Sequence, residues 1–464
     1  MREKTADLTI GRPLKQIFFF ALPLVFGTLF QQLYSFVDTV IIGRCLGETA
    51  LAAVGVTYSL NFLILGFIQG CCVGFGVPVS QSFGAGEQGE VHRYFWNGVW
   101  LSCLLAAGFT IATVLLTVPL LTLIDTPESI LPQAAAYVRI IFCGIPLTIL
   151  YNFSASILRA LGDSRRPFYS LLFSTALNIV LDILFVAVLP FGVAGAAAAT
   201  VISQGISGVV NIFVLAARTE YFRVRREEMQ FSAFHAGRLC AIGLPMGFEY
   251  SVSAIGAVIM QYAINSLGSA AIAAQTAGEK IRQMFTLPME SVGMAMATYA
   301  AQNYGAKKYG RIREGIRDGL IIQYLYCIGS FLVIFAARHA LVGLVLGEKS
   351  SETALMAAEY LTRISMLFCL HGSLMVFRNT LQGMGHSIQA IVSGIGELAG
   401  RSLGAWLALG GGFGFTAICY ANPLAWAAAL CYCTIMVWRH LREATLDKNF
   451  KILDSGESEN KKIM

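Results

Sequence analysis

The sequence predicts an all-α membrane protein with twelve transmembrane helices in two pseudo-symmetric six-helix lobes. Three observations support this: an apolar composition, twelve apolar stretches long enough to cross a bilayer, and a repeat that relates the two halves. Of 464 residues, 56% are hydrophobic and 13% are charged, whereas about 25% are charged in soluble proteins. A soluble fold of this length cannot bury so much apolar surface, so we exclude a cytosolic enzyme and a nucleic-acid binder.

The twelve stretches are found by length. A helix needs about 20 apolar residues to cross the hydrocarbon layer, and the alternating pattern of a membrane barrel is absent. The predicted spans lie near residues 16–38, 51–81, 95–121, 132–158, 167–189, 192–216, 239–265, 271–301, 319–345, 353–382, 387–410 and 413–438.

The basic residues outside the spans fall mainly on one side of the membrane. That side holds both termini and the clusters at 159–166, 218–238 and 307–317, whereas the opposite loops offer only Arg44, Arg338 and Lys349. Because basic loops stay in the cytoplasm, we expect a multi-pass plasma-membrane protein, in contact with membrane lipids, with both termini cytoplasmic.

The two halves repeat each other. Leu22-Pro23 recurs as Leu244-Pro245, and three further pairs of short motifs keep the same offset to within two residues. Each half has six spans, so the halves share one orientation, as in transporters built from parallel repeats. We therefore predict an N-lobe (1–217), a cytoplasmic linker (218–238), a C-lobe (239–438) and a cytoplasmic tail (439–464).

Glycines in the second span favour close helix packing. Gly66, Gly70 and Gly74 recur every four residues, which places them on one side of a helix. Small residues at this spacing let membrane helices approach one another closely.

Two carboxylates of the first half lie within or at the end of a predicted membrane span, where a charge is energetically unfavourable. Asp38 ends the first span, and Asp182 lies in the fifth, one turn after Asn178. Such residues mark functional sites by default, and with the oxygens of Asn178 and Thr200 they suit either a Na⁺ ion or an exchangeable proton. The alternative is that Asp38 is interfacial and Asp182 pairs with Arg139.

Polar side chains near these carboxylates define a candidate cavity. Gln31 and Tyr34 share a helix face with Asp38, and Ser203 shares one with Thr200. Tyr137 and Arg139 lie early in the fourth span. We expect these residues to line a cavity beside the carboxylates.

The charges of the second half are mostly expected to pair internally. Glu279 with Arg282 and Glu359 with Arg363 have the spacing of helical ion pairs. Glu249 has no such neighbour in the sequence and is a secondary candidate for the site.

Several motifs resemble those of the multidrug and toxic compound extrusion (MATE) transporters, over almost the whole chain. The matching segments are residues 36–43 (FVDTVIIG), 159–167 (RALGDSRRP), 177–182 (LNIVLD), 192–200 (GVAGAAAAT) and 301–306 (AQNYGA). The resemblance implies two six-helix lobes that export drugs and metabolites against the entry of Na⁺ or H⁺.

Within the family, the motifs are most similar to the prokaryotic DNA-damage-inducible branch. That likeness implies a cation site in the N-lobe at Asp38, Asn178, Asp182 and Thr200, with Tyr137 lining the same cavity. Another branch uses carboxylates of the seventh and tenth helices. Glu249 could be the seventh-helix counterpart, but His371 stands where an aspartate would be expected.

We therefore expect a cation-coupled antiporter, driven by Na⁺ or H⁺, that exports small molecules, with lipophilic organic cations as the leading class. The first alternative is a lipid-linked precursor flippase of the same superfamily. The second is an intramembrane enzyme, but neither HExxH nor GxSxG occurs, so we expect no enzyme activity. We expect a monomer with no cofactor and no bound metal other than a possible Na⁺.

Overall fold

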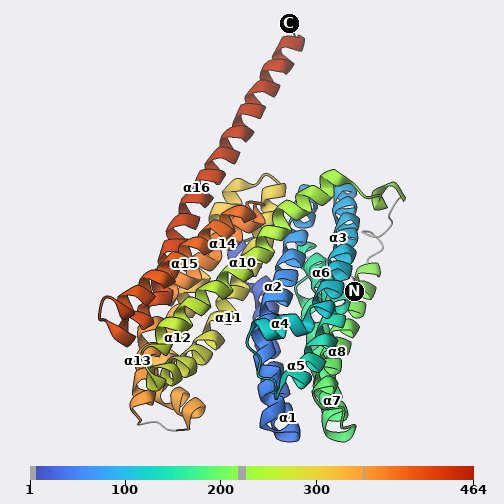
Figure 1. Ribbon diagram of the computed structural model, residues 1–464. Helices are drawn as coiled ribbons and strands as arrows, with labels where there is room; N and C mark the ends of the chain where they lie inside the picture. Colours follow the sequence, from blue (N-terminus) through green and yellow to red (C-terminus); the bar gives the residue numbers. More distant parts are fainter. Residues whose placement is uncertain (1–6, 218–225, 348–350, 464) are drawn as a thin grey trace. The chain divides into compact units, whose positions relative to one another are not determined.

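The computed structural model describes residues 7–217, 226–347 and 351–463, and every regular element in these ranges is helical (Figure 1). The first half contains α1 (Pro13–Leu46), α2 (Glu48–Ala85), α3 (Gln88–Leu115), α4 (Thr117–Leu123), α5 (Leu131–Cys143), α6 (Ile145–Ala160), α7 (Arg165–Asp182), η1 (Ile183–Val188) and α8 (Gly192–Ala216). The second half contains η2 (Arg226–Met229), α10 (Ala233–Asn265), α11 (Ser269–Gly305), α12 (Tyr309–Leu346), α13 (Glu352–Ser365), α14 (Phe368–Gly383), α15 (Ser387–Leu409) and α16 (Gly414–Ile463).

These elements form the twelve predicted spans, so the predicted fold class is confirmed. Seven spans are long apolar helices: α1, α2, α3, α8, α12, α16 and the run from α7 through η1. Two more are bent pairs, α5 with α6 and α13 with α14. The helices α10, α11 and α15 complete the set. The charges of α11, among them Glu279, Arg282 and Glu290, lower its apolar character.

The fourth span of each half is broken at the same place. The axes of α5 and α6 differ by 46°, and those of α13 and α14 by 48°. In the first half, Pro146 occupies the first turn of α6, where it cannot continue the hydrogen bonding of the preceding helix. The shared bend supports the internal repeat.

The chain forms two compact units. One contains Phe19–Phe83 and the described part of Glu87–Ala254, and the other contains Leu8–Phe18, Gly84–Gly86 and the described part of Ile255–Met464. The boundary between residues 18 and 19 falls inside α1, and the boundary between residues 254 and 255 falls inside α10. The lobe boundaries proposed from the sequence stay a prediction, and residues 218–225 of the expected linker lie outside the described residues.

Glycines hold α2 against the first part of α10 within the first unit. A Cβ atom on Gly70 would lie 2.5 Å from the carbonyl oxygen of Met246, and one on Gly74 would lie 2.5 Å from the Cα of Gly243. The glycine stripe of the second span therefore serves helix packing, as the sequence predicted.

In each unit, a side-chain oxygen accepts a hydrogen bond from a backbone N–H at the start of the helix that begins one of the two repeats. On α12, Asp318 Oδ2 accepts a hydrogen bond from the backbone N–H of Leu14 at 3.0 Å. On α3, Asn97 Oδ1 accepts one from the N–H of Ser232 at 2.8 Å. The first N–H groups of a helix have no partner within it, so these side chains anchor α1 and α10.

Candidate functional site

The site of the first unit is built around Asp182, the last residue of α7. The helix begins at Arg165, where Asp163 Oδ1 accepts hydrogen bonds from the backbone N–H groups of Arg165 and Arg166 at 3.2 and 3.1 Å. It ends at Asp182, after which the backbone widens into the π-helical segment η1. Asp182 is 0% exposed. Short π-helical segments often occur at functional sites because they reorient the helix locally.

Asn178 joins Asp182 to α8. With its amide nitrogen facing the carboxylate, Asn178 donates to Asp182 Oδ2 at 3.0 Å, and its oxygen accepts from the backbone N–H of Thr200 at 3.3 Å. The one-turn spacing of Asn178 and Asp182 makes this contact possible, because residues four apart share a helix face. The bridge fixes the orientation of the Asp182 carboxyl group.

Asp38 on α1 faces Asp182. The two carboxyl groups are close enough to share a hydrogen bond. Two carboxylates offer only acceptors, so such a bond requires that one of the two groups carry a proton. Oδ1 of Asp38 and Oδ1 of Asp182 are buried and accept no hydrogen bond from a donor group in the described part of the chain.

Two tyrosines and a threonine surround the carboxyl pair. The Tyr34 hydroxyl hydrogen-bonds to Thr200, and both Asp38 and Asp182 act on Tyr34 electrostatically. Tyr137 is buried close to the same two carboxyl groups. The structure thus brings together the four predicted cation-site residues and both predicted tyrosines.

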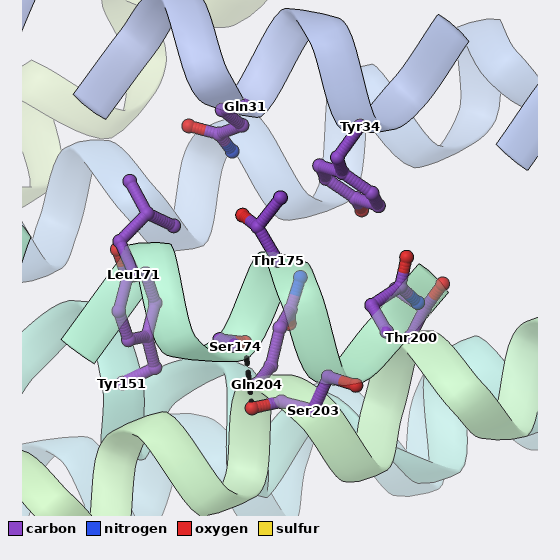
Figure 2. A pocket seen from close by; sticks show the side chains of 10 residues that line it. Gln31, Tyr34, Tyr151, Leu171, Ser174, Thr175, Thr200, Ser203 and Gln204 are labelled. Atoms are coloured by element: carbon purple, nitrogen blue, oxygen red, sulfur yellow. Dashed lines mark hydrogen bonds between the residues drawn. The ribbon is translucent and has the colours of Figure 1, made fainter. Parts of the chain in front are cut away.

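A small pocket opens beside this cluster (Figure 2). Figure 2 shows Gln31 and Tyr34 projecting from α1 toward Thr175 and Thr200. Five lining residues were expected as site or cavity residues, and five others were not. The lining consists of Gln31, Tyr34, Asn178, Thr200 and Ser203 from the first group, and Tyr151, Leu171, Ser174, Thr175 and Gln204 from the second.

None of the residues that line this pocket is charged. Arg139, predicted in the cavity, is exposed and is not among them, and no ion pair joins it to Asp182 in the described residues. Glu249 is partly buried in the first part of α10 and does not line the pocket either. The carboxyl pair therefore supplies the charge beside an otherwise uncharged pocket.

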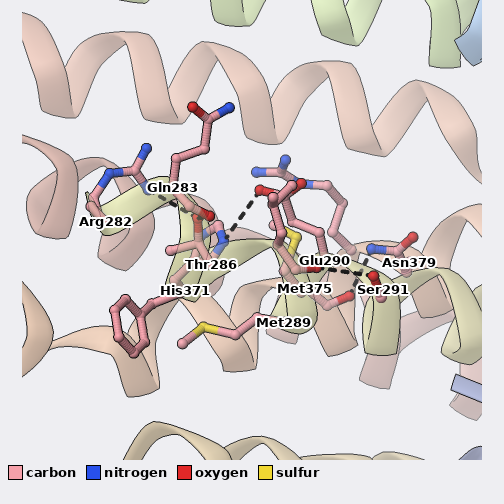
Figure 3. A network of polar contacts seen from close by, with 12 residues as sticks. Arg282, Gln283, Thr286, Met289, Glu290, Ser291, His371, Met375 and Asn379 are labelled. Carbon is pink, nitrogen blue, oxygen red and sulfur yellow. Dashed lines mark hydrogen bonds and ion pairs between the residues drawn. The ribbon is translucent and has the colours of Figure 1, made fainter. Parts of the chain in front are cut away.

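The second unit contains a separate network of charged and polar side chains (Figure 3). Arg282 Nε donates to Glu279 Oε2 at 2.8 Å, and the Tyr360 hydroxyl donates to the same oxygen at 2.7 Å. Arg363 pairs with Glu359. The two ion pairs predicted from helical spacing are therefore confirmed.

Other members of this network come from helices that are distant in the sequence. Glu397 on α15 binds both Arg378 on α14 and, at 3.1 Å, Arg401 one turn further along α15. His371 lies 3.9 Å from Glu290 and packs on Trp426 with ring centroids 4.8 Å apart. The acidic groups of the second unit are thus held mainly by arginines, unlike Asp38 and Asp182.

The described residues contain no group of three or more His, Cys, Asp or Glu side chains that could hold a metal ion. Asp38, Asp182 and Thr200 do offer hard oxygens. The Asn178 oxygen, however, accepts from a backbone N–H, and its nitrogen faces Asp182. In this arrangement both polar atoms of the Asn178 side chain bind groups of the protein, the carboxyl group of Asp182 and the backbone of Thr200.

Comparison with known proteins identifies the class of this membrane protein. The MatE family profile matches residues 23–184 and 245–406, one match in each half. The chain belongs to the MatE family, whose members are transporters and not enzymes, and the two matched segments coincide with the internal repeat.

Individual relatives agree with this placement. The chain is 30% identical over 391 residues to "Probable multidrug resistance protein YpnP" of Bacillus subtilis (strain 168), covering 84% of this chain and 86% of that protein. It is 22% identical to "Multidrug export protein MepA" of Staphylococcus haemolyticus (strain JCSC1435), covering 82% and 84%. A solved outward-facing multidrug resistance MATE family transporter shares the fold, with a TM-score of 0.89, 20% identity and 95% and 99% coverage.

Proposed function

We propose that this protein is a proton-coupled exporter of drugs and other xenobiotics, located in the plasma membrane with both termini in the cytoplasm. The observation that carries the proposal is the contact between the carboxyl groups of Asp38 and Asp182 beside the pocket. Relatives named as multidrug resistance or export proteins support the transport class. The coupling ion and the substrate class rest on the chemistry of the site.

The arrangement favours a proton over Na⁺. Two carboxyl groups this close can share one proton. The Asn178 oxygen, which a Na⁺ ion would need as a ligand, accepts instead from the backbone N–H of Thr200. Removing that proton leaves two negative charges in a poorly solvated site, and their repulsion favours uptake of another proton. The pair can thus exchange one proton in each transport cycle.

The pocket favours planar, lipophilic organic cations. Tyr34 and Tyr151 offer aromatic faces, and Gln31, Thr175 and Gln204 offer neutral hydrogen-bonding groups. A cation gains from aromatic faces and from the ionised carboxyl pair, but not from the protonated one. Proton and substrate then favour opposite states of one site, which is the differential affinity that coupling requires.

The alternative of a lipid-linked precursor flippase fits the pocket less well. A pyrophosphate group needs basic partners, and none of the lining residues is Arg or Lys. The placement in the DNA-damage-inducible branch stays a prediction, because the relatives described above, YpnP and MepA, carry other names. The proposal needs only the N-lobe site itself.

The test is efflux from proteoliposomes loaded with ethidium, a fluorescent lipophilic cation. We expect an imposed pH gradient to drive ethidium transport and a Na⁺ gradient at constant pH to have no effect. Asp182→Asn should abolish the pH-driven component. Asp125→Asn should not, because this site is exposed and asparagine tolerates its positive φ. Transport driven by Na⁺ alone would contradict the choice of proton.

A further inference from the structure

A line of buried polar side chains continues from the carboxyl pair between α7 and α8. On α7, Ser170, Ser174, Asn178 and Asp182 recur every four residues, and on α8 the facing residues are Thr200, Ser203, Ser207 and Asn211. All except Thr200 are fully or almost fully buried. We call these eight residues the α7–α8 seam.

Hydrogen bonds join the two helices at three levels of the seam. Asn178 reaches the backbone of Thr200, and Ser174 Oγ donates to the carbonyl oxygen of Ser203 at 2.7 Å (Figure 2). At the far end, Ser170 Oγ donates to Asn211 Oδ1 at 2.7 Å. Ser207 lies one turn from both Ser203 and Asn211, so it occupies the level between the last two contacts.

Helix–helix adhesion does not account for the whole seam. The hydroxyl groups of Ser203 and Ser207 and the amide nitrogen of Asn211 have no partner in the described part of the chain. Ser203 is 1% exposed, and Ser207 and Asn211 are 0% exposed. A buried polar atom left without a partner is unfavourable, and water held between such atoms is the ordinary way to satisfy them.

The seam also runs from the carboxyl pair toward one side of the membrane. From Asp182 to Ser170 the helical rise is about 18 Å, which is more than half of the hydrocarbon thickness of about 30 Å. It ends near the start of α7 at Arg165 and the end of α8 at Ala216. The arginines near these ends place them on the cytoplasmic side by the positive-inside rule.

We propose that the α7–α8 seam is a proton path that connects the Asp38–Asp182 pair with the cytoplasm; this rests on the proposed proton coupling. The proton leaves the carboxyl pair to a water molecule held at Ser203. Each hydroxyl or water along the seam accepts one proton and releases another, so none changes its net charge. Serine and water suit this role because each both donates and accepts hydrogen bonds.

The first test uses Ser207, which binds neither carboxyl group. Ser207→Val fills the space with methyl groups. During ethidium exchange it should slow proton release, measured with a pH dye trapped in the compartment on the cytoplasmic side, by about tenfold or more. Ser207→Ala removes the hydroxyl but leaves room for water, so it should slow proton release less than Ser207→Val does. The matched control is Ser102→Val on α3, a buried serine outside the seam whose hydroxyl also has no partner in the described residues.

The proposed proton path is wrong if a folded Ser207→Val variant releases protons at the wild-type rate. It is also wrong if Ser102→Val slows proton release equally. A second readout needs no transport. In a background without other cysteines, Ser207→Cys should react with silver ions added from the cytoplasmic side, and Ser102→Cys should not. If the wild-type protein moves ethidium without moving protons, the proposed proton coupling is wrong. If Ser207→Cys does not react with silver ions, water does not enter the seam, and the proton path is wrong whatever the coupling ion.

Discussion

Asn178 donates its amide hydrogen to Asp182 Oδ2 at 3.0 Å, one turn along the same helix. This contact holds the buried carboxyl group in the direction of Asp38. The arrangement explains why the two residue types occur at this spacing: an amide supplies the donor that a carboxyl group needs in a site with little water, and its oxygen remains available to bind α8.

Removal of that donor should weaken coupling. We expect Asn178→Ala to lower pH-driven ethidium transport by about tenfold, because the loss of a hydrogen bond to a charged group costs about 1.5–3 kcal/mol. The matched control is Asn152→Ala on α6, where the side chain donates to the carbonyl oxygen of Thr148 in its own helix, at 2.9 Å. Equal transport by the two variants at matched expression would show that Asn178 has no special role.

The contact between α2 and α10 should tolerate no added side chain. Gly74→Leu places its first carbon where Gly243 lies, so we expect loss of folded, monodisperse protein after detergent extraction. Gly55→Ala on the same helix meets nothing within 4 Å and should be neutral or stabilising by about 0.5–1 kcal/mol. Normal yield and melting temperature for Gly74→Leu would mean that the helices separate readily.

The charge network of the second unit should matter for stability. Glu397→Gln leaves Arg378 and Arg401 buried without their shared carboxylate, and removing one partner of a buried pair costs about 3–5 kcal/mol. Glu359→Gln breaks the pair with Arg363, which is more exposed, and should cost at most about 1 kcal/mol. Thermal unfolding in detergent measures both, and a similar shift in the two variants would contradict this ranking.

Acid should destabilise the junction between α14 and α15. His386, in the turn before α15, is stacked on His440 with ring centroids 3.8 Å apart, and burial, reinforced by the neighbouring imidazole, lowers the pKa of His386 to about 4. The unfolded chain therefore binds a proton more readily, so this contribution to stability is present above about pH 6.5 and is lost as the pH falls toward 4. We expect His386→Gln to reduce the drop in melting temperature between pH 7 and pH 5; an unchanged drop would assign it to other groups.

The sequence predicted the spans well because crossing a bilayer requires long apolar helices. It also predicted that Asn178 and Asp182 project to the same side, because they lie four residues apart on one helix. It did not predict that Tyr151, Leu171 and Gln204 line the pocket. These residues lie on three different helices, and only packing places them around one space. The bond of Arg378 to Glu397 was missed for the same reason.

Charge alone was an incomplete guide to the site. Arg139 lies early in the fourth span but is exposed, whereas uncharged Ser207 and Asn211 are fully buried. A serine in an apolar helix carries little signal in the sequence, since it is equally compatible with simple helix packing. Its significance appears only when the facing helix supplies Ser170 and Ser174.

The most direct test of the account compares Asp38→Asn with Glu249→Gln. Both changes remove one negative charge from a partly buried residue of the first unit, but only Asp38 faces Asp182. Proteoliposomes with trapped pH dye would report protons and ethidium moved by each variant at matched protein content. We predict that Asp38→Asn moves neither against a gradient, while Glu249→Gln keeps proton-driven export with at most a changed rate or substrate range. Proton-driven export by Asp38→Asn together with its loss in Glu249→Gln would contradict the N-lobe site.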